Sequence, residues 1–310
     1  MATVKESIPH IIRTADDPRQ QGVWTARISE IEQVNSKIRL LKLSLPRDGP
    51  PLRHLPGQYI DLYIPNVDVV GGFTITSPPG AASFDKTENP HIELAIQCSP
   101  TNPPAAYLWR PAAEILNSPV SFKVGGNFVY PPPTTAPQKL DRVVFVAGGV
   151  GINPIMSMVS AIHEAGLGLA GTESSSEKIP VPKTVRVLYT SRREKSPQGQ
   201  SEPVLFEARL RSIADHWSSR KDVMDYTYTF FETSASGEAE AKEDEQTQNS
   251  TTCYRRINHN DLLDAIGPQE TRPNTFVYVC GLPTMTDEFV SFLKNTPGVD
   301  ERKVLCEKWW

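Results

Sequence analysis

Short stretches in which apolar and polar positions alternate recur along the first part of the chain. They cover residues 23–31, 38–45, 58–64, 72–77, 91–98 and 120–124, and proline, glycine and asparagine residues separate them. A period of two between turn residues is typical of strands with one buried and one exposed face. Strands at this spacing predict a small antiparallel β-barrel or sandwich, and closure into a barrel would leave no exposed edge.

The second part of the chain has a different rhythm. Strand-like runs at 142–147, 184–190, 226–231, 275–280 and 303–307 alternate with helical patterns at 153–165, 204–217, 259–266 and 285–294. Runs such as VVFVA and TFVYVC are apolar at nearly every position, as a strand buried on both faces of a sheet requires. The pattern predicts a doubly wound parallel α/β domain whose ligand lies at the carboxyl ends of the strands.

Proline marks the boundary between the two patterns. The 28 prolines are concentrated between residues 46 and 137, and they end in a cluster at 131–133 and 137. Such a cluster is stiff and extended, which is typical of a connector between domains. We therefore expect a flexible N-terminal segment at 1–22, a β-barrel domain at 23–137 and an α/β domain at 138–310.

Two segments interrupt the α/β pattern. Residues 166–183 are rich in Gly, Ser, Glu and Pro, and residues 234–252 are acidic with almost no large apolar side chain. Neither segment can bury enough surface to offset the entropy of ordering it, so both are expected to be flexible surface loops. A tolerated insertion is the favoured interpretation, and a docking site for a partner is the alternative.

Composition excludes several classes of function. The net charge is −4 and no basic stripe is present, which argues against a nucleic-acid partner bound through its phosphates. The longest apolar stretch, 143–152, is interrupted by glycines and far shorter than the roughly 20 residues of a membrane helix, so no membrane span is expected. The histidines stand apart from one another and from the cysteines, so no zinc site is expected.

The expected compartment is intracellular. The four cysteines form no C-x-x-C pair, which favours a reducing environment. The first residues lack the apolar region of a secretory signal. Glu6, Asp16 and Asp17 oppose a mitochondrial presequence, whereas Arg13 and Arg19 favour one. The choice between mitochondrion and cytoplasm therefore stays open.

The sequence AGGVGINP at 147–154 lies directly after the VVFVA strand and before a helical pattern. Gly148, Gly149 and Gly151 remove side chains where a phosphate could approach main-chain N–H groups at a helix N-terminus. The context suits a dinucleotide site. The spacing departs from G-x-G-x-x-G, and a glycine-rich β–α turn without a ligand is the alternative.

Two further motifs are expected near the same edge of the sheet. Cys280 and Gly281 end another strand of that sheet, where a thiol would reach a bound ligand, although a buried core cysteine is the alternative. The C-terminal EKWW places Glu307 beside Trp309 and Trp310, whose rings could stack on a flat heterocycle while the carboxylate handles a proton. A hydrophobic clamp between the domains is the alternative there.

The barrel contributes GGFTITSP at 71–78. Phe73 offers a ring to a planar heterocycle, and hydroxyls follow on Thr74, Thr76 and Ser77. An ordinary strand that enters a Ser-Pro-Pro turn is equally consistent with these residues.

The order of these motifs resembles the ferredoxin-NADP reductase superfamily. GGFTITS, VGGNF, AGGVGINP, VYVCGLPTM and EKWW follow one another as in that superfamily, and the resemblance covers about residues 23–310. It is most similar to the eukaryotic branch of the oxidoreductase NAD-binding domain-containing protein 1 type. The resemblance implies an FAD-binding barrel, an NAD(P)-binding α/β domain, and hydride transfer from NAD(P)H to FAD with electrons passed to an unidentified protein or small-molecule acceptor.

The resemblance also implies roles for individual residues. The reaction would be carried by Cys280, Glu307 and Thr74. The cofactors would be held by Phe73, Thr74, Thr76, Ser77, Gly125, Gly126, Asn127, Gly148, Gly149, Gly151, Pro154, Ser191, Arg192, Gly281, Trp309 and Trp310. The Ser-Arg pair that often binds the 2′-phosphate of NADPH is absent at 233–235, so a preference for NADP is not supported.

The chain departs from the superfamily pattern at two phosphate contacts. Gly71 stands where an arginine would pair with the flavin pyrophosphate, and Ala105 stands where a serine is usual. A charge-assisted contact of this kind contributes about 1.5–3 kcal/mol. Three alternatives remain: weak binding of flavin, binding through Gly125, Gly126 and Asn127, or a different flavin. A nicotinamide-nucleotide-binding or interaction protein that has lost tight flavin binding is the alternative function.

Overall fold

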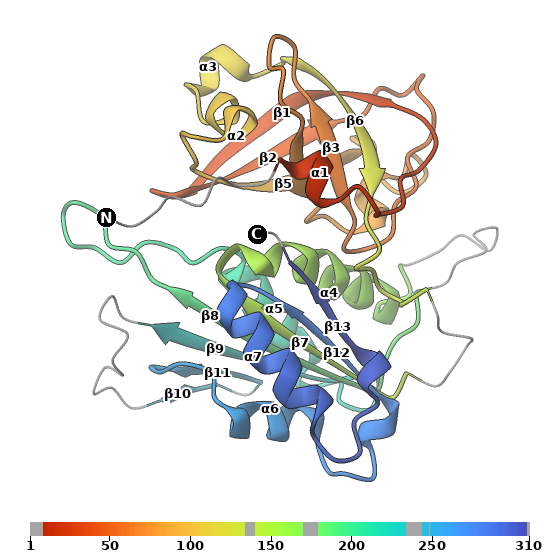
Figure 1. The fold of residues 1–310 in the computed structure, drawn as a ribbon, viewed down its shortest axis with the longest axis vertical. Helices are drawn as coiled ribbons and strands as arrows, with labels where there is room; N and C mark the ends of the chain where they lie inside the picture. Colours follow the sequence, from red (N-terminus) through yellow and green to blue (C-terminus); the bar gives the residue numbers. More distant parts are fainter. Residues whose placement is uncertain (1–8, 134–139, 170–178, 234–243, 248, 309–310) are drawn as a thin grey trace.

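The computed structural model describes residues 9–133, 140–169, 179–233, 244–247 and 249–308, which form two domains stacked along the long axis of the molecule (Figure 1). The upper domain is a six-stranded antiparallel sheet in the order β4-β3-β6-β1-β2-β5. A bridge between Ile75 and Leu94 joins its two ends and closes it as a barrel. The strands are β1 (Trp24–Asn35), β2 (Ile38–Ser44), β3 (Tyr59–Tyr63), β4 (Gly71–Thr74), β5 (His91–Gln97) and β6 (Pro119–Gly125).

Alternation of side chains builds the barrel core. The first half of β1 alternates strictly between buried and exposed positions, so Trp24, Ala26 and Ile28 point inward. They join a cluster of aliphatic and aromatic side chains from all six strands and from two short helices, α2 (Pro103–Leu108) and α3 (Ala112–Ile115). Helix α2 begins at Asn102, whose side chain accepts a hydrogen bond from the backbone N–H of Ala105.

The lower domain is a seven-stranded sheet in the order β10-β11-β9-β8-β7-β12-β13, in which every pair is parallel except β10 with β11. The strands are β7 (Arg142–Gly148), β8 (Thr184–Arg192), β9 (Asp225–Thr233), β10 (Glu245–Gln246), β11 (Ser250–Cys253), β12 (Thr275–Cys280) and β13 (Val304–Glu307). The helices are α4 (Ile152–Gly166), α5 (Glu207–Ser218), α6 (His259–Ile266) and α7 (Pro283–Lys294). Short 3-10 turns occupy Pro79–Ala82, Gly149–Gly151, Arg272–Asn274 and Glu301–Lys303.

Helices cover both faces of this sheet. Successive residues of β7 enter different clusters, because Phe145 packs with α4 and α5 whereas Val144 packs with α6 and α7. This explains why the strand is apolar at nearly every position. The barrel followed by a doubly wound α/β domain confirms the fold class predicted from the sequence.

The two domains share one hydrophobic cluster and several polar contacts. Leu40, Ala95, Phe128 and Tyr130 pack with the residues of α4 and α5. Arg209 of α5 forms two hydrogen bonds of 2.7 and 2.8 Å to the carboxylate of Glu93, which is almost fully buried in β5. Further bonds run from Asn153 Nδ2 to Ala95 O (3.3 Å) and from Ser157 Oγ to Ser77 O (2.8 Å).

Residues 9–22 differ from the flexible segment expected at 1–22. Helix α1 (His10–Arg13) and the residues that follow it pack on the barrel, and His10 and Thr14 are buried. Their partners are Asp61 and other residues of β3, far away in sequence, which is why no local pattern revealed the contact.

Part of the segment expected as a loop at 234–252 is ordered as strand. Ser250, Thr252 and Cys253 are buried in β11, which pairs with β9 at residues 250–253. The polar sequence STTC hid this strand because its buried hydroxyls are satisfied by a distant arginine, Arg211. Residues 234–243 and 248 of that segment, and 170–178 of the segment 166–183, lie outside the described residues.

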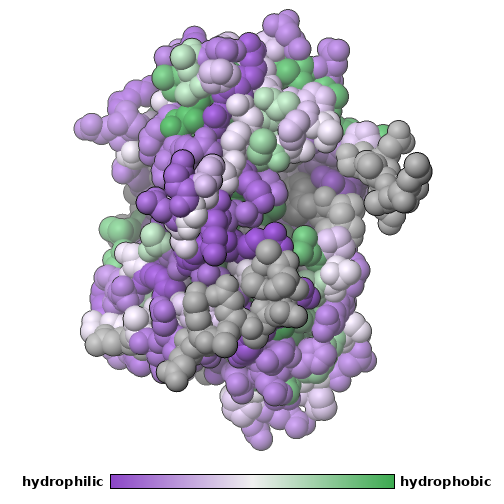
Figure 2. Space-filling view, turned by 90° about the vertical axis from the view of Figure 1, so that its left-hand side faces the viewer, coloured by the Kyte–Doolittle hydropathy of each residue, from purple (hydrophilic) through white to green (hydrophobic). Residues whose placement is uncertain are grey.

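One face of the molecule is mostly polar. On the face shown in Figure 2, hydrophilic residues predominate and hydrophobic ones lie in small separate groups. Among the residues that the structure describes, none of the helices combines the length and the apolar character needed to cross a bilayer.

Candidate functional site

The glycine turn between β7 and α4 is the centre of the candidate site. Gly149 has a φ of +55°, and nothing lies within 4 Å of the position that a Cβ atom would take there. At Gly151, by contrast, a Cβ atom would stand 2.3 Å from the carbonyl oxygen of Cys280. One glycine therefore leaves open space in front of the turn, and the other lets the start of α4 approach the end of β12.

Three strand ends meet at this turn. In the parallel registers, Cys280 lies opposite both Ala147 of β7 and Glu307 of β13. Gly281 follows Cys280 and packs against Gly148, because a Cβ atom at Gly281 would lie 3.0 Å from the Gly148 nitrogen. The structure thus brings the glycine turn, the thiol and the carboxylate to one edge of the sheet, the edge that faces the barrel (Figure 1).

Cys280 is a buried, neutral thiol. Its side chain is 1% exposed, and burial raises its pKa well above the ordinary value, with a further increase from the charge of Glu307. A thiolate nucleophile is therefore disfavoured at neutral pH. The thiol can pack against a ligand or donate a weak hydrogen bond, and Glu307 beside it is only half-buried.

The first turn of α4 connects the site to the barrel. Pro154 is buried in this turn, and Asn153 donates its Nδ2 hydrogen bond to Ala95 O in β5. The backbone N–H groups that begin α4, a helix of 15 residues, point toward the edge where the strands end. This arrangement suits an anionic group such as a phosphate.

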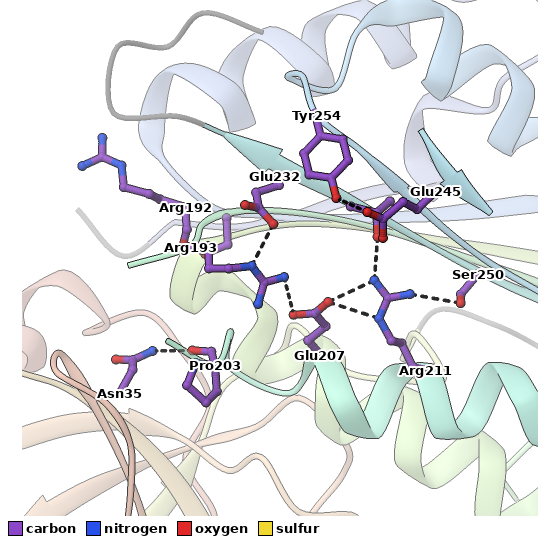
Figure 3. A network of polar contacts seen from close by, with 12 residues as sticks. Asn35, Arg192, Arg193, Pro203, Glu207, Arg211, Glu232, Glu245, Ser250 and Tyr254 are labelled. Atoms are coloured by element: carbon purple, nitrogen blue, oxygen red, sulfur yellow. Dashed lines mark hydrogen bonds and ion pairs between the residues drawn. The ribbon is translucent and has the colours of Figure 1, made fainter. Parts of the chain in front are cut away.

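The parallel strand β8 ends at the same edge of the sheet with Ser191 and the exposed Arg192. Figure 3 shows Arg192. Arg192 points away from the polar network that its neighbour Arg193 forms. Arg193 binds Glu232 (2.8 Å) and Glu207 (2.9 Å).

Arg211 extends this network to Ser250 and Thr252 of β11. No pattern in the sequence predicts the pairing of Arg193 with Glu207 and Glu232, because it depends on how β8, β9 and α5 converge.

On the barrel, β4 carries the residues expected to face a ring. Phe73 lies opposite Ile60 in the β3–β4 register and packs against the barrel core. A Cβ atom at Gly71 would stand 2.5 Å from the Phe73 ring and 2.8 Å from Pro104. An arginine at position 71 would therefore require both neighbours to move.

Thr76 and Ser77 form hydrogen bonds to Glu93 at the boundary between the two domains. Thr76 Oγ1 donates to Glu93 Oε1 (2.9 Å), and Ser77 Oγ accepts from the Glu93 backbone N–H (3.0 Å). The Thr76 hydroxyl thus positions the carboxylate that binds Arg209, and the Ser77 hydroxyl holds the backbone of the same residue. Thr74 lies in β4 opposite Tyr59 of β3 and is also buried.

The barrel groups expected to contact a flavin pyrophosphate are engaged within the chain. Pro103 and Pro104 have no N–H, and the Ala105 N–H is bonded to Asn102. The Gly126 N–H donates to Pro18 O (3.0 Å), and Gly125 pairs with Arg19 in a β-bridge. In this conformation the barrel therefore does not fit a pyrophosphate at these positions.

Three other expected residues complete the picture. Asn127 is exposed beyond β6. Trp309 and Trp310 lie outside the described residues. The described residues contain no group of three or more His, Cys, Asp or Glu side chains that could hold a metal ion.

Comparison with known proteins identifies the family. No family model matches the chain. The chain is 32% identical over 305 residues to the oxidoreductase NAD-binding domain-containing protein 1 of Bos taurus, with 97% of this chain and 85% of that protein covered. The Danio rerio protein of the same name is 30% identical over 308 residues, with 99% of this chain and 100% of that protein covered.

The chain belongs to the oxidoreductase NAD-binding domain-containing protein 1 family. Solved structures of other proteins share the fold of this chain. A ferredoxin NADP+ reductase from Neisseria gonorrhoeae with bound FAD and NADP has a TM-score of 0.59 at 14% identity, with 94% of this chain and all of that chain covered. The CS-b5R domains of human Ncb5or in the NAD+ form also have a TM-score of 0.59, at 15% identity, with 95% of this chain and 71% of that chain covered. The fold is therefore that of the reductases that bind FAD and a nicotinamide nucleotide.

Proposed function

We propose that this protein is a flavin-dependent NAD(P)H oxidoreductase, in which a hydride passes from NAD(P)H to FAD and electrons pass to a protein or small-molecule acceptor. One observation carries the proposal. The glycine turn, Cys280 and Glu307 lie together at the edge of the α/β sheet that faces the barrel. Ligands of open α/β sheets bind at the carboxyl ends of the strands, and this edge is where a nicotinamide would meet a ring held by the barrel.

The α/β domain supplies the nucleotide site. The N–H groups at the start of α4 bind the pyrophosphate, and the open space at Gly149 allows its approach. Ser191 and Arg192, at the end of β8, lie on the side of the turn where the ribose and phosphates continue. Cys280 packs against the nicotinamide as a neutral thiol, and the Glu307 carboxylate lies beside it as the acid–base group closest to the reacting ring.

The steps assigned to this chain end with the delivery of the nicotinamide to the domain junction. FAD, when bound, accepts the hydride as a pair of electrons and can release them one at a time. The barrel groups that would contact its pyrophosphate are engaged within the chain in the conformation described here. Thr74 remains the barrel residue proposed to face its ring, because Phe73 precedes it in β4, points to the opposite face and packs against the barrel core.

This engagement favours a second candidate function. A nicotinamide-nucleotide-binding module without flavin would have the same glycine turn but no use for a barrel phosphate site. The two candidates differ in one property of the purified protein. A flavoprotein acquires the visible absorbance of FAD, whereas the module stays colourless with FAD added but is still stabilised by NADH.

The nucleotide site can be tested with a pair of matched glycines. Gly149 and Gly168 both have a positive φ, +55° and +75°, and both face open space, so alanine imposes similar backbone strain at each. Only Gly149 lies in the proposed site. We expect Gly149→Ala to weaken NADH binding at least about tenfold, comparable to the loss of one charge-assisted phosphate contact. Gly168→Ala should leave binding unchanged.

Calorimetric titration with NADH and with NADPH measures both variants and identifies the preferred nucleotide. Equal affinity in the wild-type protein and in Gly149→Ala would remove the glycine turn from the site.

A further inference from the structure

Helix α1 and the residues that follow it up to residue 22 form a strap across the outside of the barrel. This N-terminal strap, residues 9–22, lies over β3 and β4 at the base of the barrel, above α4 (Figure 1). The ring of His10 stands directly on β4. An ideal Cβ atom at Gly72 would lie only 2.1 Å from His10 Nδ1, so the strap occupies the space that a side chain at position 72 would fill.

A buried carboxylate holds the strap in place. Asp61 of β3 is 2% exposed, and each of its two oxygens contacts the strap. His10 Nε2 lies 2.7 Å from Oδ1, and Arg19 Nε donates to Oδ2 at 3.0 Å. Burial alone would raise the pKa of Asp61, but the hydrogen bonds from His10 and Arg19 lower it overall. Asp61 is therefore an ionised anchor whose partners both come from the strap.

Further contacts extend the attachment along β3 and β6. The Tyr59 hydroxyl donates to Asp17 Oδ2 (3.0 Å), and the Tyr59 ring meets His10 edge-on at 5.0 Å. The backbone of the strap pairs with the end of β6 through Gln20 N to Val124 O (2.9 Å) and Gly126 N to Pro18 O (3.0 Å). The strap thus contacts Gly125 and Gly126 of the VGGNF sequence, which were expected to contact a flavin.

The strap lies against the barrel half of the proposed site. In the β3–β4 register, Tyr59 pairs with Thr74 and Asp61 pairs with Gly72, so His10 covers the strand face that carries Thr74. Arg13 of the same helix is half-buried. Burial lowers the pKa of Arg13, and the charges of Glu307 and Tyr59 raise it. Helix α1 therefore lies on the face of β4 that carries Thr74, and the charge of Glu307 in the α/β domain acts on its Arg13.

We propose that the N-terminal strap is an intramolecular gate on the flavin site, so that FAD binds only when the strap leaves β3 and β4. The inference rests on the proposed function, because Thr74 and Glu307 are the residues proposed on either side of the reacting rings. In the closed conformation described here, the His10 ring occupies the space beside Gly72, and Pro18 O accepts the hydrogen bond of the Gly126 N–H. Release of the strap frees the face of β4 and this N–H together.

Gly72→Ala should displace the strap although it changes no residue of the strap itself. The φ of Gly72 is outside the left-handed region, so alanine suits the backbone of β4, but its Cβ atom excludes the His10 ring. His10→Ala releases the same contact from the other side and also removes the bond to Asp61. Ile12→Ala is the matched control, because the Ile12 side chain on the same helix is 66% exposed.

Two quantities are measured for each variant. Mass spectrometry gives the rate of trypsin cleavage after Arg13 and Arg19, and flavin fluorescence gives the affinity for FAD. We expect Gly72→Ala and His10→Ala to speed cleavage and to increase FAD affinity roughly tenfold or more, since a gate lowers apparent affinity by the fraction of open molecules. Added FAD should speed cleavage of the wild-type protein. In His10→Ala, the further change Gly72→Ala should have no effect on either readout.

The outcomes separate the gate from the proposed function. Faster cleavage with unchanged FAD affinity would overturn the gate while leaving the flavin function in place. Faster cleavage with no FAD binding in any variant, although NADH still binds, would overturn the flavin half of the proposed function and the gate with it. Ile12→Ala should match the wild-type protein in both readouts, and a response there equal to that of Gly72→Ala would also overturn the gate.

Discussion

His54 shows how burial controls the charge of a single residue. Its side chain is 5% exposed, in the loop before β3, and burial lowers its pKa to about 4 from the usual 6.5, against a smaller opposite effect from the Ser77 backbone. A histidine held neutral in this way makes the free energy of unfolding depend on pH, because its side chain binds a proton more readily in the unfolded chain than in the folded one.

The sign and size of the effect follow from these two pKa values. Between pH 6.5 and about 4 the unfolded state binds more protons, so the free energy of unfolding falls as the pH falls through this window. The loss contributed by His54 between pH 7.5 and pH 5 is about 2 kcal/mol. Urea unfolding of the wild-type protein and of His54→Leu at both pH values should show this loss only in the wild-type protein. The same pH dependence in both would contradict a neutral His54, and His91→Leu serves as the control.

At the scale of elements, the sequence predicted what depends on local periodicity and on strand ends. The glycine turn, Cys280 and Glu307 could be placed together because the carboxyl ends of parallel strands lie at one edge. The N-terminal strap could not be predicted, because His10 and Asp61 are 51 positions apart and neither lies in a periodic pattern that points to the other. Strand β11 was missed for a related reason, since Arg211 of α5 satisfies its polar residues.

Arg211 should therefore decide whether β11 stays on the sheet. Its guanidinium donates to Thr252 Oγ1 (2.7 Å) and Ser250 Oγ (3.2 Å), both in β11 and both buried. We expect Arg211→Met to remove the bond to Thr252 Oγ1 while Ser250 Oγ keeps its bond with Thr247, to cost about 1–3 kcal/mol, and to speed hydrogen exchange of the amides of residues 250–253. Arg302→Met, which removes an exposed ion pair with Asp300, is the control. Unchanged exchange in β11 would show that backbone pairing with β9 suffices.

At the scale of the whole molecule, the domain junction is fixed by one buried carboxylate. Glu93 of the barrel accepts two hydrogen bonds from Arg209 of the α/β domain, one from Thr76, and is 4% exposed. The shared cluster around Ala95 and Phe128 adds apolar contacts across the same boundary. Proline-rich composition predicted a boundary between two domains, but the ion pair that joins them depends on their docking and has no local signature.

The Arg209–Glu93 pair should behave as a buried pair whose loss is costly. Arg209→Met leaves the Glu93 carboxylate buried without its cation, and we expect a destabilisation of about 2 kcal/mol, at the lower end for such pairs because the arginine is partly exposed. The double variant Arg209→Met with Glu93→Gln should recover part of this loss. Chemical denaturation measures all three proteins. No recovery in the double variant would show that the arginine contributes through packing rather than through charge.

The central claim is that the edge formed by β7, β12 and β13 delivers a hydride from a nicotinamide nucleotide to a flavin on the barrel. The most direct test is the visible absorbance of the protein saturated with FAD, recorded without oxygen while NADH is added. The account predicts that the band of oxidised flavin disappears on addition of NADH, and that Gly149→Ala requires more NADH for the same change. A band that persists while NADH raises the melting temperature of the protein would contradict it.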